Sequence, residues 1–192
     1  MSSVAPVART EPRRTDSRIT RDRLIESVGT WVAVNGSAPE RLADLTAVAG
    51  VSVATAYRHF SSIDDAILAY VLRLPEQAAA RFAKSDRAHL DAHDRFHRWN
   101  QAWVRASIDQ GSVAVHLRSP RGFLERRAER ETTVAFVCDR VEPLLEPLVD
   151  DLIPALVVWN AVSDPREVLD LQHTMKWSQE RVARFITDRT LA

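Results

Sequence analysis

The chain has 192 residues, of which 45% are hydrophobic and 27% charged, so it is long enough to bury a core in a small domain joined to a larger one. Its formal net charge is zero, which excludes the bulk electrostatic attraction to nucleic acid that strongly basic proteins have. The single cysteine, Cys138, excludes an internal disulfide and a zinc site built from cysteines, and no apolar run approaches the roughly 20 residues of a membrane span.

Residues 1–17 carry two prolines and several arginines without any apolar period, which predicts a disordered, arginine-containing leader. The leader lacks the apolar core of a signal peptide, so we expect a cytoplasmic protein. Two interpretations of its arginines stay open. They belong to a solvated tail, or they form an arm that reaches into a DNA minor groove.

The next segment, residues 20–36, has the pattern of an amphipathic helix that ends at Asn35-Gly36. Its apolar face consists of Leu24, Val28, Trp31 and Val32.

Residues 42–60 predict two short helices joined by a glycine turn. Gly50 can end the first helix because glycine adopts the left-handed conformation without a Cβ penalty. Ser52 can cap the second helix by accepting a hydrogen bond from the backbone two or three residues on. Ala56 and Phe60, four residues apart, face inward. This arrangement is a helix-turn-helix, a common DNA-binding geometry.

The segment resembles the DNA-binding head of TetR-type transcriptional regulators. The resemblance rests on Gly50-Val51-Ser52 followed by Thr55 and by Tyr57-Arg58-His59-Phe60, downstream of the helix at 20–36, and it covers about residues 18–71. It implies an all-α fold, with an N-terminal helix-turn-helix head and a C-terminal helical bundle that binds an effector and forms a homodimer. We therefore expect a DNA-binding domain at 18–63 and a ligand-binding and dimerisation domain at 64–192.

One face of the second short helix supplies the candidate DNA contacts. Thr55 and Arg58 project from the same side, and a hydroxyl with a long bidentate donor suits base edges. The resemblance implies phosphate contacts for Tyr57 and His59, although these two could instead close the core of the head. At the start of the helix, small apolar side chains could touch thymine methyls and a hydroxyl could bind phosphate. The full set is Ser52, Val53, Ala54, Thr55, Tyr57, Arg58 and His59.

Four positions depart from the TetR pattern. Ile63 stands where these proteins often place a phosphate-contacting lysine, so one anchor to the DNA backbone is missing. Arg41 replaces a Ser or Thr cap, whereas Ser37 and Glu40 offer an earlier capping box, which predicts that the helix begins early. Thr46 and Ala56 alter the packing between the two short helices, and neither change removes a groove-facing residue.

The remainder predicts a helix from Ser62 to Leu74, a kink at Pro75, and five or six further helices. Ser178 is placed to cap the last of these helices. The breaks between helices fall near residues 85–86, 111–112, 119–120, 150–151 and 163–165.

By the same resemblance, the body binds an unknown small-molecule effector in a helical cavity, without a cofactor. The candidate ligand-binding residues are Phe96, Trp99, Trp103, His116 and Trp159, because aromatic side chains supply contact area. Ordinary core packing is the alternative for each of them. We place the dimer interface on the last helices, around Ala155, Val158, Val182, Phe185 and Ile186, and a two-fold dimer predicts a palindromic operator.

No constellation of residues indicates catalysis, so we expect no enzyme activity. Cys138 lies in an apolar stripe typical of a buried structural thiol.

His89, His93 and His97 share one helix face, but the outer two would lie about 12 Å apart along the axis, too far for one ion. A metal site would need Asp86, Asp94 or a residue from another helix as a further ligand. We assign no metal site and favour a solvated or pocket-lining histidine face.

The sequence thus predicts a sequence-specific transcriptional regulator, a repressor that a small molecule releases from a palindromic operator. One alternative is a helical small-molecule-binding protein with a degenerate DNA-binding head, which Ile63 and the zero net charge favour. A second alternative is an all-helical enzyme centred on the histidine face.

Overall fold

The computed structural model describes residues 11–86, 90–111, 113–117 and 119–192. Within these ranges the chain is helical and contains no strand, which confirms the all-α prediction. It divides into two compact units, Met1–Tyr70 (the head) and Val71–Ala192 (the body). The division lies at the end of the fourth helix, seven residues beyond the boundary predicted at residue 63.

The head contains α1 (Glu11–Asn35), α2 (Leu42–Ala49), α3 (Val53–His59) and most of α4 (Ile63–Val71). Residues 11–17 are helical, so the prediction of disorder is wrong for this part of the leader. Pro12 stands in the first turn of α1, where a missing N–H breaks no helical hydrogen bond. Residues 1–10, the rest of the predicted leader, lie outside the described residues.

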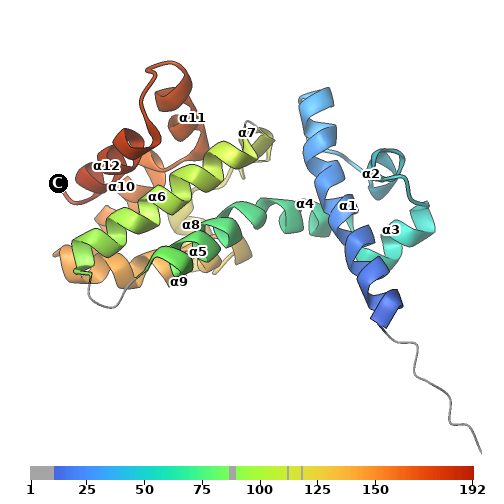
Figure 1. Ribbon diagram of the computed structural model, residues 1–192, viewed down its shortest axis with the longest axis horizontal. Helices are drawn as coiled ribbons and strands as arrows, with labels where there is room; N and C mark the ends of the chain where they lie inside the picture. The colour runs from blue at the N-terminus through green and yellow to red at the C-terminus, as the bar shows by residue number, and fades with distance from the viewer. Residues whose placement is uncertain (1–10, 87–89, 112, 118) are drawn as a thin grey trace, which may run out of the picture. The chain divides into compact units, whose positions relative to one another are not determined.

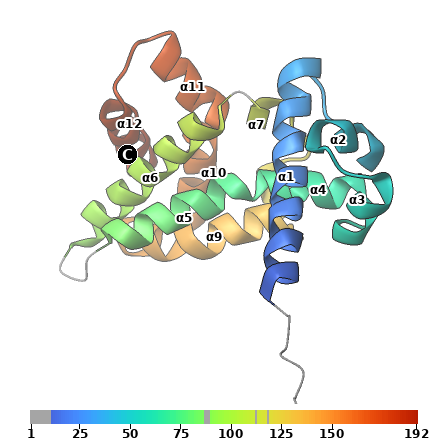
Figure 2. The same ribbon diagram turned by 45° about the vertical axis from the view of Figure 1, so that its right-hand side comes forward.

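The head has a small aliphatic core in which α1 packs against both α2 and α3 (Figure 2). Leu24 and Val28 of α1 and Leu45 of α2 are fully buried. Ala56 and Phe60 are buried as the four-residue spacing predicted. The core therefore fixes which face of α3 remains exposed.

Gly29 lets the end of α4 approach α1 closely. A Cβ atom at this position would lie 2.6 Å from the hydroxyl oxygen of Tyr70, closer than real Cβ contacts come. A larger residue here would displace the Tyr70 ring, so glycine suits this packing although it lowers helix propensity.

The predicted helix from Ser62 to Leu74 is interrupted before Pro75. α4 ends at Val71 and α5 begins at Arg73, so the break falls at Leu72. Pro75 lies in the first turn of α5, where proline fits without kinking the helix. The predicted kink at Pro75 is therefore wrong in position, and the break lies three residues earlier, at Leu72.

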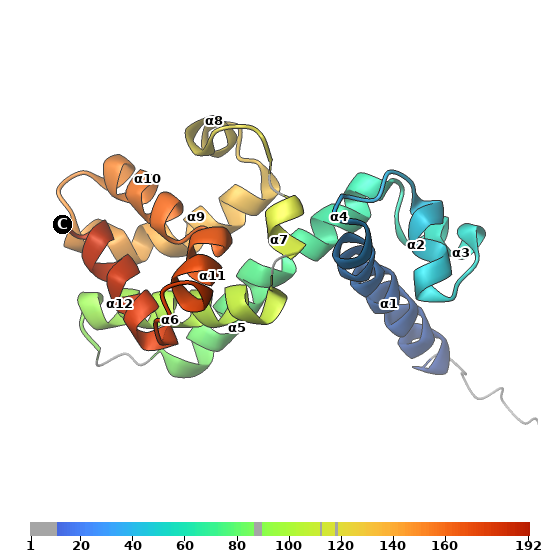
Figure 3. The same ribbon diagram turned by 90° about the horizontal axis from the view of Figure 1, so that it is seen from above.

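The body is built around α6 (Ala92–Gln110), which packs against α5 (Arg73–Ser85), α9 (Thr132–Leu145), α11 (Pro165–His173) and α12 (Gln179–Thr190) (Figure 1). Three shorter elements follow α6 or α9: α7 (Val113–His116), α8 (Phe123–Ala128) and the 3-10 turn η1 (Glu146–Leu148). α10 (Leu152–Val162) packs against α12 and α9. Figure 3 shows α8 at the edge of the body, joined to the start of α9.

Most predicted breaks in the body are confirmed, because the helices end or begin beside residues 85–86, 111, 151 and 164. The Ser178 cap is also confirmed, since its Oγ accepts from the Arg181 N–H at 3.2 Å. One break was missed between α8 and α9, where Arg130 adopts a left-handed φ of 51°.

Large aromatic side chains dominate the core of the body. Phe96 and Trp99 are fully buried on α6, and the Trp103 ring meets the Trp159 ring edge-on, with centroids 5.2 Å apart. Asn100, also fully buried, accepts from Trp159 Nε1 at 2.9 Å and donates to Thr187 Oγ1 at 3.0 Å. These polar contacts tie α6 to α10 and α12. Within the described ranges, no helix is long and apolar enough to span a membrane.

Candidate nucleic-acid interface and ligand cavity

The turn between α2 and α3 has the geometry that the sequence predicted. Gly50 ends α2 with a φ of 64°, in the left-handed region. Ser52 Oγ accepts from the Thr55 N–H at 3.1 Å and so caps α3. The two short helices are therefore held at a defined junction by local contacts.

α2 begins at Leu42, so the prediction of an earlier start is wrong. The Asp44 carboxylate accepts from the Arg41 N–H at 2.9 Å and from the Glu40 N–H at 3.1 Å. This carboxylate supplies the capping that the serine at residue 37 was expected to give, and Arg41 stands at the cap position without a capping side chain.

The candidate DNA contacts lie on the open face of α3. Tyr57 is 59% exposed and therefore does not close the core of the head. Arg58 and Ala54 are exposed, as are Ser52 and Val53, whereas Thr55 and His59 are half-buried.

A hydrogen-bonded chain orders part of this face. Arg58 Nη2 donates to Thr55 Oγ1 at 3.0 Å, and Thr55 Oγ1 lies 2.9 Å from Ser52 Oγ. The guanidinium thus folds back along its own helix, and its remaining N–H groups can donate elsewhere. An aromatic contact supports the inner side of α3, where Arg21 of α1 stacks over the Phe60 ring at 5.0 Å.

The start of α4 carries acidic groups where a phosphate contact would need donors. The Asp65 carboxylate accepts from the Ser61 N–H at 3.1 Å and from the Ser61 hydroxyl. The Ser61 hydroxyl bond is the main reason that the pKa of Asp65 lies below its ordinary value. With Ile63 and Asp64 beside it, this helix start presents no cation to a phosphate.

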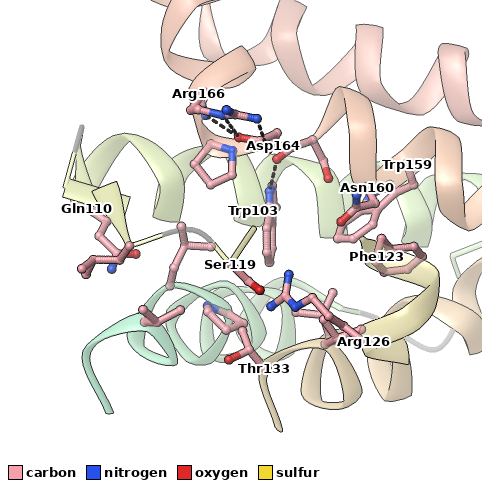
Figure 4. Close-up of a pocket in the computed structure, with 18 of the residues that line it drawn as sticks. Trp103, Gln110, Ser119, Phe123, Arg126, Thr133, Trp159, Asn160, Asp164 and Arg166 are labelled. Atoms are coloured by element: carbon pink, nitrogen blue, oxygen red, sulfur yellow. Dashed lines mark hydrogen bonds and ion pairs between the residues drawn. The ribbon is translucent and has the colours of Figure 1, made fainter. Parts of the chain in front are cut away.

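The body holds a cavity of about 170 Å³ that is partly open to solvent. Its walls include Trp103, Trp159 and Phe123, which come from α6, α10 and α8 (Figure 4). The Trp103 indole N–H donates to the Ser163 carbonyl oxygen at 2.7 Å, which fixes its ring along the cavity. The space can hold a small, largely apolar molecule with a few polar groups.

Charged side chains line the same cavity. Asp164 and Arg166 bond each other on one wall, at 3.1 Å between Nε and Oδ1. On the opposite side, the guanidinium of Arg126 points into the space below Trp103 (Figure 4). Arg126 is held by Glu131, whose pKa lies below its ordinary value chiefly because of this hydrogen bond.

The five predicted ligand residues separate in the structure. Trp103 and Trp159 line the cavity. Phe96 is fully buried core, and the exposed His116 of α7 is not among the lining residues. Trp99 lines a second cavity of about 210 Å³ between α5, α6 and α9.

The charged lining residues were not among the predicted ligand residues. Arg126 lies in a run of charged residues, and such a run does not by itself indicate a cavity lining. Asp164 was placed only in a helix break, although an Asp-Pro pair at a helix start is a capping signal that would have marked it as ordered.

The predicted dimer residues do not share an open surface. Val182 and Ile186 are fully buried in the body's own core, and Ala155 is buried with them, so these three cannot form an intersubunit contact. Phe185 packs on Trp177 with centroids 5.5 Å apart. Val158 remains exposed on α10.

The described histidines of α6 have different surroundings. His97 Nδ1 lies 3.0 Å from Thr187 Oγ1 and its Nε2 lies 3.1 Å from Glu180 Oε1, so this ring joins α6 to α12. His93 is exposed at the start of α6, where it, Asp91 and Asp94 offer ligand atoms within 4.8 Å of one another, and Asp91 also caps the helix. His89 lies outside the described residues.

Cys138 is buried on α9. Burial is the main reason that its pKa is raised to about 11. A thiol with this pKa is almost entirely protonated near neutral pH, as expected of a structural cysteine.

Two solved structures share this architecture. The TetR-like transcriptional regulator LfrR from Mycobacterium smegmatis, in complex with proflavine, matches 91% of this chain and 96% of its own, with a TM-score of 0.58 and 15% identity. The chain has the TetR-like fold. The multidrug binding protein EbrR, complexed with imidazole, matches 98% of this chain and 98% of its own, with a TM-score of 0.60 and 21% identity. No family model matches the sequence, and neither does any curated protein.

The two candidate sites lie in different units of this TetR-like fold. A transcriptional regulator and a multidrug binding protein share this fold. The capped α3 lies in the head, and the aromatic cavity lies wholly in the body.

Proposed function

We propose that this protein is a DNA-binding transcriptional regulator, a repressor that leaves its operator when a small molecule occupies the body. The observation that carries the proposal is the capped α3, which exposes Arg58 and Tyr57 on one face of a TetR-like head. Seven residues act at this face: Ser52, Val53, Ala54, Thr55, Tyr57, Arg58 and His59. Arg58 and Thr55 read base edges, and Tyr57 and His59 contact phosphates.

The first experiment measures binding of the purified protein to the DNA that flanks its own gene, at two salt concentrations. Binding should weaken as salt rises because phosphate contacts release counterions. Arg58→Ala should weaken specific binding about tenfold or more, since one good base contact contributes about 1–3 kcal/mol. Arg184→Ala on α12, an exposed arginine of the body, serves as the matched control and should bind as the wild type does.

Failure to bind this DNA specifically, or any fragment of a genomic library, would contradict the DNA-binding proposal. It would favour a small-molecule-binding protein with a degenerate head. The acidic start of α4 and the zero net charge are the observations that support this second candidate.

We infer that the effector occupies the cavity lined by Trp103 and Trp159. LfrR and EbrR were each solved with a small aromatic molecule, which supports a ligand for this body as well. Binding of effector and operator is thermodynamically reciprocal, so operator DNA should lower effector affinity by the factor by which effector lowers DNA affinity.

We also propose that the protein is a homodimer whose interface includes the outer face of α10. This helix has no charged residue, and it is apolar on both sides. Its inner side packs into the body through Leu156 and Trp159. The outer side keeps helical spacing with Pro154, Val157, Val158 and Ala161 exposed.

A second copy of the chain suits this stripe because a two-fold axis pairs a patch with itself. Val157→Glu should shift the protein from dimer to monomer in sedimentation and weaken binding to a palindromic operator. Met175→Glu, at an exposed apolar residue outside α10, is the control and should leave the mass unchanged. A monomeric wild-type protein would contradict this assignment. We further expect the regulator to act in the cytoplasm, where its operator lies.

A further inference from the structure

Arginines outnumber acidic residues in the lining of the body cavity. Three arginines, Arg121, Arg126 and Arg166, belong to the lining, and Asp164 is the one acidic residue among the described lining residues. The acids that pair with Arg121 and Arg126 lie outside the lining.

Both carboxylate oxygens of Asp164 already accept hydrogen bonds from within the protein. Its Oδ1 accepts from the Arg166 backbone N–H at 3.0 Å and from Arg166 Nε at 3.1 Å, and its Oδ2 accepts from Arg166 Nη2 at 3.2 Å. It also stands at the start of α11, where the helix dipole favours a negative charge. A cationic ligand would have to compete with all of these partners for the one lining carboxylate.

Arg126 is arranged differently. Glu131 holds one edge of its guanidinium, through Nε and through Nη2, the latter at 2.9 Å from Oε1. A guanidinium has five N–H donors, so the other edge can bind a second acceptor. The side chain is only 17% exposed, and it points into the cavity below Trp103 (Figure 4). A charge-assisted bond formed in such a partly dry space is stronger than one at the surface.

The walls and the volume limit the size of the ligand. Trp103 and Phe123 present aromatic surface near the guanidinium. The volume of about 170 Å³ is close to that of cavities of about 150 Å³ that take up benzene. One aromatic ring with a short polar substituent therefore fits without expansion of the cavity.

We propose that the cavity binds a small aromatic carboxylate, with its carboxylate on Arg126 and its ring against Trp103 and Phe123. This inference deepens the proposed effector site and rests on it. The proposed ligand is an anion, whereas a cavity with a free carboxylate in its lining would select a cation.

Benzoate, benzylamine and benzyl alcohol test the proposal, because they have similar shapes and differ in charge. Binding is measured by calorimetry and by quenching of tryptophan fluorescence. We expect benzoate to bind at least tenfold more tightly than benzylamine or benzyl alcohol. Equal or tighter binding of benzylamine, or no binding of any of the three, would overturn the proposal.

Two variants separate a ligand contact from a structural ion pair. Arg126→Gln should remove the preference for benzoate, whereas Glu131→Gln keeps the guanidinium, removes the competing carboxylate charge and should tighten benzoate binding several-fold. An equal loss of binding in both variants would show that the pair only supports the fold, and would overturn the proposal. Arg184→Gln, at an exposed arginine of α12 outside the lining, is the control.

The DNA assay distinguishes this inference from the proposed function. Benzoate that binds with the expected preference but leaves DNA affinity unchanged would support the cavity chemistry and contradict the coupling. Salt-sensitive operator binding by a protein that prefers benzylamine would leave the regulator intact and overturn the ligand class.

Discussion

The head and the body of this protein are stabilised by contacts of different range. In the head, the polar contacts that fix the helix starts join residues three or four apart, as Ser52 joins Thr55 and Asp65 joins Ser61. In the body, the decisive polar contacts join distant segments, as Trp103 joins Ser163 and Asn100 joins Thr187. The cores also differ, because the head is mainly aliphatic and the body is rich in tryptophan.

This difference suits two different tasks. Local capping presents a short helix in one conformation at little cost in chain ordering, which is what contact with DNA requires. A cavity needs walls from several helices, so its shape depends on how those helices pack together. A substitution in the body core should therefore disturb ligand binding and body stability together, and a substitution in a head cap should act locally.

The largest expected effect is that of Trp99→Ala in the body. Trp99 is fully buried between Phe82 and Trp103, so its loss should lower the free energy of unfolding by about 3–5 kcal/mol. Chemical denaturation, followed by hydrogen exchange in each unit, measures the effect. The half-buried Trp177 provides a control, and Trp177→Ala should cost clearly less. If head and body peptides lost equal protection from hydrogen exchange, the effect of a body core residue would not be confined to the body.

Asn100→Leu should have the next largest effect, about 1–3 kcal/mol, again confined to the body. Leucine keeps the volume but leaves the Trp159 N–H without its acceptor inside the core. Adding Trp159→Phe removes that donor, so the double variant should lose less than the sum of the two single losses. Strict additivity in thermal unfolding would show that the hydrogen bond contributes little.

The sequence predicted the head more fully than the body because the head's contacts are local. The roles of Gly50 and Ser52 follow from spacing alone, and the structure bears out both. The early start of α2 was a wrong prediction because the capping group is Asp44, three residues inside the helix, rather than a residue before it. Two capping signals competed there, and periodicity could not choose between them.

In the body, hydrophobic periodicity predicted the apolar helix faces and most helix ends. It could not predict which apolar faces remain exposed on the surface. Val182 and Ile186 form an apolar stripe whether the partner is α6 or a second subunit, and the structure assigns them to the internal core. Arg126 could not be recognised as a lining residue because the other walls of the cavity come from segments distant in sequence, such as Trp103 and Trp159. Contacts between segments distant in sequence therefore determine which residues line the cavity, and sequence spacing does not predict them.

A matched pair of cap variants sharpens the comparison with a smaller effect. Ser52→Ala and Ser178→Ala remove the same type of hydrogen bond from α3 and from α12, at a cost of about 1 kcal/mol each. Hydrogen exchange should quicken about fivefold, in head peptides for the first variant and in body peptides for the second. Faster exchange in α12 after Ser52→Ala would contradict the independence of the two units.

The smallest expected effect is a dependence on pH at the turn between α8 and α9. The hydrogen bond from Arg126 holds the pKa of Glu131 below its ordinary value of 4.5, so the folded state binds this proton less readily than the unfolded state. The resulting stability is complete above about pH 4.5 and is lost as the pH falls through the lower, folded pKa. Since the pair is partly solvated, it contributes less than about 1 kcal/mol. Glu131→Gln should melt below the wild type at pH 6 and approach it below pH 4, because the other carboxylates titrate alike in both proteins. A constant difference in melting temperature across this range would show that Glu131 acts through packing rather than charge.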